Sequence, residues 1–344
     1  MLADGKLKEL HTASGGDWGG TKVDNAFKQM LIKIFSLPVL RKFQRQYTED
    51  YIDLFREFEV KKREITPARD LTINTRIPVV LKEIFEKETE ETVPEVIKQM
   101  NFDGKMSFTG DKLKVDASVF KSFFDEAITG IVDHLEGLFM ESSTHGTTAI
   151  LMVGGFSESA MLQSAIKKAF PDKRLIVPEE AGLVVLKGAV VFGHHPSAIQ
   201  TRVCKHTYGI ELNPLFSDIH HDNHRKFESN GRFYCKDVFD KHVEIGQKLN
   251  YGEPQSDRMY APLTSTQEHV DVVVYASSER QPTYVTDKGC TQVGKFTINV
   301  RDMSVPLSMR TLNVTLTFSG TEIEVSATER DTGKVTKSNV NFLG

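Results

Sequence analysis

The pattern of apolar and polar positions changes near residue 200. Up to about residue 193, apolar residues recur at helical spacing and alternate with short continuous apolar runs, which is typical of an α/β domain. From residue 207 onward, most segments alternate apolar and polar residues between turn signals, which predicts mainly antiparallel β structure. The residues between them begin with a polar stretch that contains Pro196. We therefore predict an α/β domain over residues 1–193, a linker over 194–206 and a β-rich domain over 207–344.

The first domain is predicted to contain several helices and short strands. Helical spacing of apolar residues predicts helices over residues 23–35, 47–63, 79–88 and 93–100. The apolar side predicted for the second helix consists of Tyr47, Ile52, Phe55 and Val60. Residues 71–77 predict a strand, and residues 105–115 predict a hairpin. Asp116 or Ser118 is the predicted N-cap of one long amphipathic helix that continues to Phe139.

The second domain is predicted to be a series of strands. Alternation is clear in five segments, at residues 270–275, 294–300, 312–318, 322–328 and 335–340. Residues 319–321 are the predicted turn of a hairpin. His220, His221 and His224 could hold a metal or lie in a polar surface loop. Because the segment lacks helical periodicity and a suitably spaced cysteine, we favour the loop and predict no metal site.

Composition excludes several classes of protein. The 344 residues carry 43 Lys and Arg against 47 Asp and Glu, and this net charge of −4 gives no reason to expect nucleic-acid binding. The apolar runs are too short for a membrane span, which needs about 20 apolar residues. The N-terminus has no signal-peptide pattern, and the three cysteines, Cys204, Cys235 and Cys290, form no CxxC pair. We therefore expect a cytoplasmic protein with free thiols and no membrane or nucleic-acid partner.

Two glycine turns are the candidate functional features. A continuous apolar run at residues 149–153 predicts a strand buried on both faces. Gly154 and Gly155 end this strand, and Ser157 is the predicted N-cap of the next helix. Such a turn places backbone N–H groups and the positive end of a helix dipole where an anion can bind, although tight packing of strand against helix accounts equally well for the glycines.

The other glycine cluster, residues 15–20, also precedes a helix but lacks the spacing of a P-loop, so a flexible turn is the alternative. Ser157 lies in the sequence GFSES, which does not fit the GxSxG pattern of a nucleophile elbow. We therefore predict no catalytic residue.

Several of these motifs together resemble the seventy-kilodalton heat-shock chaperone family. Residues 150–159 (ILMVGGFSES) and 177–190 (VPEEAGLVVLKGAV) resemble its last nucleotide-binding loop and the helix that follows, in a form closest to the divergent twelfth subgroup. Residues 13–24 (ASGGDWGGTKVD) resemble its Gly-Asp…Gly-Gly…Asp segment. Residues 294–296 (GKF) and 324–334 resemble motifs of its β-rich substrate domain. The matches occur in one collinear order along nearly the whole chain.

The resemblance implies a fold, a cofactor and a set of site residues. Residues up to 193 would form the second lobe of an actin-like, ribonuclease-H-like nucleotide-binding domain, and residues 207–344 a substrate-binding-like β domain. The implied ligand is ATP or ADP, with Mg²⁺ in intact relatives, and the implied partners are unfolded or client protein segments and co-chaperones. The positions carried over are Gly19 and Gly20 beside the nucleotide, Glu59, Lys62, Arg63 and Thr66 around the adenosine, and Gly154, Gly155 and Ser157 in the last loop.

The spacing of the four adenosine positions agrees with this assignment. Offsets of three, four and seven place Glu59, Lys62, Arg63 and Thr66 on one face of a helix. A carboxylate there can accept hydrogen bonds from ribose hydroxyls, and the alkyl parts of Lys and Arg can lie along a purine. A solvated charged helix surface is the alternative explanation.

The sequence also departs from the family pattern. The phosphate loops, the catalytic lysine and the acidic Mg²⁺ positions would all precede Met1, and Glu158 stands where typical members have an arginine stacked on the adenine. The leucine-rich linker and the helical lid are also missing. We therefore expect a truncated chaperone-like protein that binds nucleotide weakly at most and has no ATPase activity on its own. The alternative is a non-enzymatic scaffold or regulator that keeps the fold and has lost the nucleotide cycle.

Overall fold

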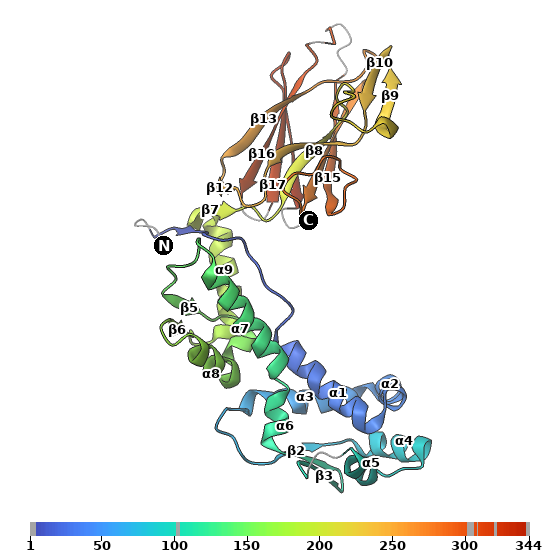
Figure 1. Ribbon diagram of the computed structural model, residues 1–344, viewed down its shortest axis with the longest axis vertical. Coiled ribbons are helices and arrows are strands. Elements are labelled where there is room, and N and C mark those ends of the chain that lie inside the picture. The colour runs from blue at the N-terminus through green and yellow to red at the C-terminus, as the bar shows by residue number, and fades with distance from the viewer. Residues whose placement is uncertain (1–4, 101–103, 301–305, 308, 320–321, 342–344) are drawn as a thin grey trace. The chain divides into compact units, whose positions relative to one another are not determined.

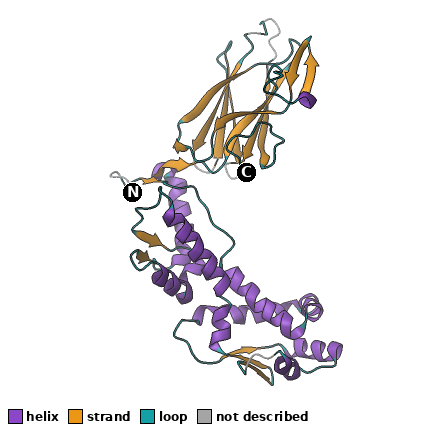
Figure 2. Ribbon diagram, in the orientation of Figure 1, coloured by secondary structure: helices purple, strands orange, loops and turns teal. Residues whose placement is uncertain are grey.

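The chain folds into two compact units (Figure 1). The structure is a computed structural model that describes residues 5–100, 104–300, 306–307, 309–319 and 322–341. One unit is residues 14–190, which we call the α/β unit, and the other combines the described residues of 1–13 with those of 191–344, which we call the β unit. Helices dominate the first and strands the second (Figure 2). The fold class is therefore mixed α/β, with several antiparallel sheets.

Nine α-helices begin in the described residues of the α/β unit, and the last of them, α9, continues a few residues into the β unit. They are α1 (Gly20–Phe35), α2 (Leu37–Gln46), α3 (Thr48–Glu64), α4 (Val79–Thr89), α5 (Val93–Gln99), α6 (Ala117–Ser122), α7 (Asp125–Met140), α8 (Ala160–Ala169) and α9 (Ala181–His194). Strands β2 (Ile73–Arg76), β4 (Lys112–Val115) and β3 (Met106–Thr109) form an antiparallel sheet in that order, and β5 (Ala149–Leu151) pairs in parallel with β6 (Arg174–Ile176).

The predicted long helix from residue 116 to 139 is in fact two helices. Asp116 is the N-cap of α6, as predicted, and its carboxylate accepts a hydrogen bond from the Ser118 backbone N–H at 2.8 Å. The helix is then interrupted at Phe123 and Phe124, which are both buried, and α7 begins at Asp125. Helix α2 was not among the predicted helices.

The core of the α/β unit is rich in phenylalanine. Phe27 of α1 and Phe58 of α3 are fully buried, and their rings stack with centroids 4.0 Å apart. The apolar side predicted for α3 is therefore wrong in part, because Ile52 and Val60 are 43% and 55% exposed while the helix buries Leu54 and Phe58. The position of Phe27 on α1 decides which side of α3 faces inward.

The prediction that residues 149–153 form a strand buried on both faces is also wrong. Strand β5 ends at Leu151, and the side chains of Leu151 and Val153 are 60% and 42% exposed. Met152 faces the other way and joins a small apolar cluster with residues of α8 and the loop after it, Leu162, Ile166 and Phe170. The apolar run thus has one buried side.

The β unit is built around two four-stranded antiparallel sheets. One sheet has the order β11-β8-β14-β15 and the other β13-β16-β17-β18. The strands are β8 (Thr207–Leu212), β11 (Val238–Val243), β13 (Pro254–Tyr260), β14 (His269–Ser277), β15 (Cys290–Asn299), β16 (Leu312–Ser319), β17 (Glu322–Glu329) and β18 (Val335–Asn341). Residues from both sheets, such as Val274 and Leu316, share one core, so the sheets form a sandwich. In the predicted turn at residues 319–321, Gly320 and Thr321 lie outside the described residues.

A third small sheet includes the start of the chain. Its order is β1 (Leu7–Lys8), β7 (Ile199–Val203) and β12 (Lys248–Asn250), with β1 parallel to β7. The Glu9 carboxylate also accepts a hydrogen bond from the Val203 N–H at 2.9 Å. The segment predicted as a linker, residues 194–206, therefore contains a paired strand, and residues 5–13 cluster with the β unit.

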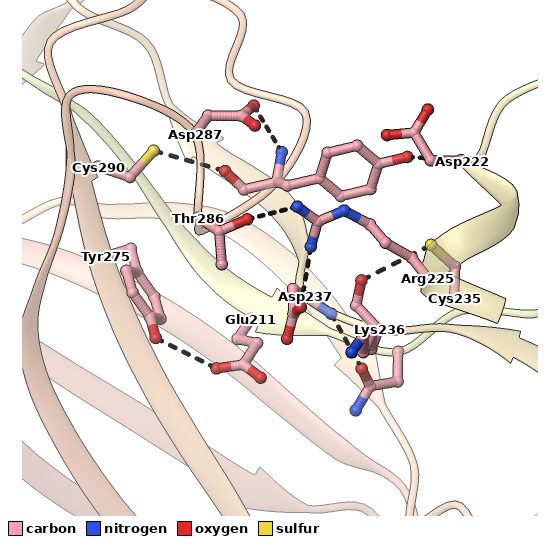
Figure 3. A network of polar contacts seen from close by, with 12 residues as sticks. Glu211, Asp222, Arg225, Cys235, Lys236, Asp237, Tyr275, Thr286, Asp287 and Cys290 are labelled. Carbon is pink, nitrogen blue, oxygen red and sulfur yellow. Dashed lines mark hydrogen bonds and ion pairs between the residues drawn. The ribbon is translucent and has the colours of Figure 1, made fainter. Parts of the chain in front are cut away.

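An arginine anchors the hairpin of β9 (Lys226–Ser229) and β10 (Arg232–Cys235) to the rest of the β unit (Figure 3). The Arg225 guanidinium donates hydrogen bonds to the Asp237 carboxylate at 2.8 Å and to the Thr286 hydroxyl at 2.6 Å. Its guanidinium also lies 4.0 Å from the centre of the Tyr284 ring. Cys290 lies at the edge of this network, and its thiol donates a hydrogen bond to the Tyr284 carbonyl. The network attaches the hairpin to the sandwich, and none of the predicted site residues belongs to it.

None of the helices in the described part of the chain has both the length and the apolar character that a membrane span requires.

Candidate functional site

A pocket of 460 Å³ lies in the α/β unit where α1 begins, α3 ends and the chain turns after β5. Its lining residues come from three separate parts of the sequence. They are Gly20, Thr21, Asp24, Glu59, Lys62, Arg63, Gly155, Phe156, Glu158 and Ser159. The volume is within the range of about 300–1,000 Å³ that is usual for small-molecule sites.

The structure brings together five of the nine predicted site residues in this pocket. These five are Gly20, Glu59, Lys62, Arg63 and Gly155. Gly19 and Ser157 instead line a neighbouring apolar hollow of 440 Å³ beside Trp18, and Thr66 and Gly154 are not among the lining residues of either. The two glycine turns, at residues 15–20 and 154–157, therefore lie close together, since Gly20 and Gly155 line the same pocket.

Thr66 is separated from the other adenosine positions because α3 ends before it. The helix stops at Glu64, and Thr66 begins a turn in which its carbonyl accepts a hydrogen bond from the Arg69 N–H at 3.1 Å. The predicted helical register therefore does not extend to Thr66.

Ser157 holds the glycine turn and does not cap the next helix as predicted. Its side chain is buried, and its hydroxyl donates a hydrogen bond to the Gly154 carbonyl at 2.6 Å within a short 3₁₀ helix, η1 (Gly155–Glu158). The N-cap of α8 is Ser159, which accepts from the Leu162 N–H at 3.5 Å. Gly154 has a φ of +88°, a backbone conformation that favours glycine.

Lys62 is the central charge of the pocket. Its ammonium lies 2.6 Å from the Asp24 carboxylate and 2.5 Å from that of Glu59, and 3.4 Å from the Gly20 carbonyl. The side chain is only 10% exposed. Because Asp24 and Gly20 belong to α1 and Glu59 to α3, Lys62 ties together the two helices that form the walls.

Glu59 is ionised and has two cationic partners. Burial of its carboxylate opposes ionisation, but hydrogen bonds from Lys62 and Arg63 outweigh this effect and hold the pKa of Glu59 below its usual value. Its hydrogen bond to Arg63, at 2.8 Å, in turn raises the pKa of that guanidinium. A carboxylate has about four lone-pair positions, so Glu59 can still accept hydrogen bonds from a ligand hydroxyl.

Five of the ten lining residues were not predicted as site residues, and two of these, Asp24 and Phe156, contribute to the walls of the pocket. Asp24 follows Gly20 by one helical turn of α1. Phe156 lines the pocket, and its ring lies nearly parallel to that of Phe124, with the centroids 6.5 Å apart. The aromatic residue inside the GGFSES motif was a visible signal for a flat apolar wall. Nothing in the sequence pointed to the pairing of Asp24 with Lys62, which are 38 residues apart.

We expect Lys62→Met to destabilise the α/β unit by about 2 kcal/mol, because Asp24 and Glu59 would lose their shared partner. This is less than for a fully buried pair, since both carboxylates retain some contact with water. Urea unfolding followed by Trp18 fluorescence measures the change. Lys61→Met, on the same helix but outside the pocket lining, is the control and should alter stability by less than about 0.5 kcal/mol.

Comparison with known proteins gives three long matches. The chain is 29% identical over 348 residues to human heat shock 70 kDa protein 12B, covering 98% of this chain and 51% of that protein. It is 30% identical over 346 residues to heat shock 70 kDa protein 12A of mouse and of human, covering 99% of this chain and 51% of each relative. The resemblance to the twelfth subgroup of the seventy-kilodalton heat-shock family is confirmed. No family model matches the chain.

The chain spans about half the length of these heat shock 70 kDa relatives. The similarity covers both units, because 98% or more of the chain is aligned. The similarity to these heat shock 70 kDa proteins therefore extends over the α/β unit, which holds the pocket, and over the β unit.

Proposed function

We propose that the α/β unit binds the adenosine part of an adenine nucleotide in the 460 Å³ pocket. The observation that carries this proposal is the convergence of Gly20, Glu59 and Gly155, which are distant in sequence, on one small-molecule-sized cavity. Similarity to heat shock 70 kDa proteins supports it, because these residues are the ones that the family resemblance assigns to the nucleotide. On this proposal, the α/β unit corresponds to the second lobe of an actin-like nucleotide-binding domain.

The residues of the pocket fit an adenosine. The Glu59 carboxylate can accept hydrogen bonds from the ribose hydroxyls, and the half-buried Phe156 ring offers a flat face to a purine. The aliphatic part of Arg63 can cover the opposite side of the base. These contacts are either apolar or hydrogen bonds that the protein accepts, so they suit the nucleoside part of the ligand better than its phosphates.

We propose further that the 344-residue chain assayed by itself does not hydrolyse ATP. Phosphoryl transfer needs cations that neutralise the phosphate charge, and Lys62 is already bound by Asp24 and Glu59. The same feature favours the second candidate function, a scaffold or regulator that keeps the fold and binds no nucleotide. The two candidates differ in one measurable property, which is saturable binding of an adenine nucleotide.

The proposed role of the β unit is to bind client protein segments in the manner of a chaperone. A 370 Å³ pocket between β8 and β14 and the loop after β13 is one place for an extended peptide. Strand addition at a free sheet edge is another. We also propose a cytoplasmic location, which the three free cysteines support.

Titration of the chain with a fluorescent adenine nucleotide, with and without Mg²⁺, tests nucleotide binding. We expect Gly155→Asp to weaken binding at least about tenfold, because it adds a negative charge to the pocket wall. A Cβ at Gly155 meets nothing within 4 Å, so the position has room for the first atom of a side chain. Gly155→Asn has nearly the same shape without the charge and should weaken binding by less than about threefold.

Absence of saturable binding at millimolar nucleotide would contradict the proposal and leave the scaffold function. An equal loss of nucleotide affinity in Gly155→Asp and Gly155→Asn would show that the size of the side chain, and not its charge, weakens binding.

A further inference from the structure

The charges that line the pocket are unfavourable for a polyphosphate. Three carboxylates, of Asp24, Glu59 and Glu158, face two cations, Lys62 and Arg63. Lys62 is held between Asp24 and Glu59, and Arg63 is 69% exposed, so that water screens its charge. The cavity therefore carries a net negative charge and has no buried cation that is free to meet a phosphate.

Glu158 occupies the place where an anionic ligand would be expected to bind. Its Oε1 accepts a hydrogen bond from the Gly182 N–H at 3.0 Å, in the first turn of α9. The backbone N–H groups and the dipole at the start of a helix of this length attract anions, and here the anion is a side chain of the protein itself. A Cβ on Gly182 would lie 3.1 Å from the same oxygen, so a glycine at this position allows the close contact.

We propose that this pocket selects the neutral nucleoside over its diphosphate and triphosphate, and that Glu158 is the residue that determines this specificity. The inference rests on the proposed function, because it names the ligand class for the same pocket. The adenosine contacts described above, to Glu59 and Phe156, require no charge on the ligand. Each added phosphate brings negative charge toward Glu158 and Asp24, and the binding free energy becomes less favourable.

Isothermal titration calorimetry of the whole chain with adenosine, AMP, ADP and ATP tests the inference. The titrations are made in EDTA and at constant ionic strength, so that metal binding and screening do not differ between ligands. We expect adenosine to bind at least as tightly as ATP. For Glu158→Gln we expect ATP affinity to rise about fivefold while adenosine affinity changes by less than about twofold.

Glu179→Gln is the matched control, since it removes the same charge from an exposed position outside the pocket lining. It should leave the ratio of ATP to adenosine affinity unchanged. The wild-type chain provides a second, independent readout. If repulsion limits ATP binding, added NaCl should strengthen ATP binding, whereas binding that depends on attraction would weaken with salt.

The outcomes separate this inference from the proposed function. ATP binding that is tighter than adenosine binding and weakens with salt would overturn the nucleoside preference and leave the nucleotide pocket in place. A preference for adenosine that persists unchanged in Glu158→Gln would overturn the role of Glu158. If none of the four ligands binds at millimolar concentration, the proposed function itself is wrong.

Discussion

Replacing Phe58 with alanine is expected to lower the free energy of unfolding of the α/β unit by about 4 kcal/mol. Phe58 is fully buried, stacks on Phe27 and contacts the rings of Phe120 and Phe123, so truncation leaves a large cavity among aromatic side chains. The expected loss is a large part of the 5–15 kcal/mol or so that stabilises a typical domain.

The single tryptophan, Trp18, belongs to the α/β unit, so urea unfolding followed by its fluorescence measures this stability. Val60→Ala is the control, because Val60 lies on the exposed side of the same helix, and it should cost less than about 0.5 kcal/mol. Similar losses for the two variants would show that the core does not depend on this side of α3. Because Glu59 and Lys62 are on the same helix, Phe58→Ala should also weaken ligand binding.

The β unit is expected to lose about 3 kcal/mol of stability between pH 6.5 and pH 4 through one histidine, His242 of β11. Burial lowers the pKa of His242 to about 4, and Arg258 acts in the same direction while Asp240 and Ser256 oppose it. Its ring bonds the Tyr260 hydroxyl and the Ser256 hydroxyl, each at 2.7 Å.

Acid lowers the free energy of unfolding of the β unit because His242 binds a proton more readily in the unfolded chain than in the folded one. Between pH 6.5 and 4 the unfolded chain binds a proton at this residue and the folded chain does not, so acid favours unfolding. Above pH 6.5 the histidine is neutral in both states, and the penalty is absent. Below about pH 4 both states are protonated, and the loss from this residue stops increasing.

Urea unfolding by far-UV circular dichroism at pH 7 and pH 4.5 measures the acid loss, and Trp18 fluorescence identifies the separate transition of the α/β unit. In His242→Gln the pH dependence of the β-unit transition should shrink by most of this amount. His220→Gln, which changes an exposed histidine of the same unit, should retain the wild-type dependence. If the β unit of His242→Gln loses as much stability between pH 7 and pH 4.5 as the wild type does, other groups cause the loss.

Much of the β unit could be predicted from the sequence because its sheets bury one side of each strand. Strand β16 alternates between buried and partly exposed residues along its whole length, and the predicted segment 312–318 differs from it by one residue. The alternation is visible because the two sheets share a single core. Helix α3 was harder to predict, because apolar residues lie on more than one side of it. Long-range packing against Phe27 and Phe120 makes Phe58, and not Val60, a core residue.

Several residues of the candidate site could be predicted from the sequence, but the contacts between its charged side chains could not. The family resemblance assigned Gly20, Glu59 and Gly155 to one site, and in the structure they line one pocket. The state of the charges depends on contacts between distant residues, such as Lys62 with Asp24, which no local pattern reveals. Local patterns also could not distinguish Ser157 from Ser159 as the helix cap, since both precede the same helix at short distance.

The β unit is discontinuous, because strand β1 at the start of the chain pairs with β7 after residue 190. A fragment that begins at residue 191 would therefore lack the edge strand β1. The backbone groups of Ile199 and Thr201 that pair with β1 would then be exposed and could pair with another molecule. Recombinant isolation of the β unit should instead remove residues 14–190 and join residues 5–13 to residue 191 through a flexible linker. Such an internally deleted polypeptide should remain monodisperse where the simple truncation self-associates.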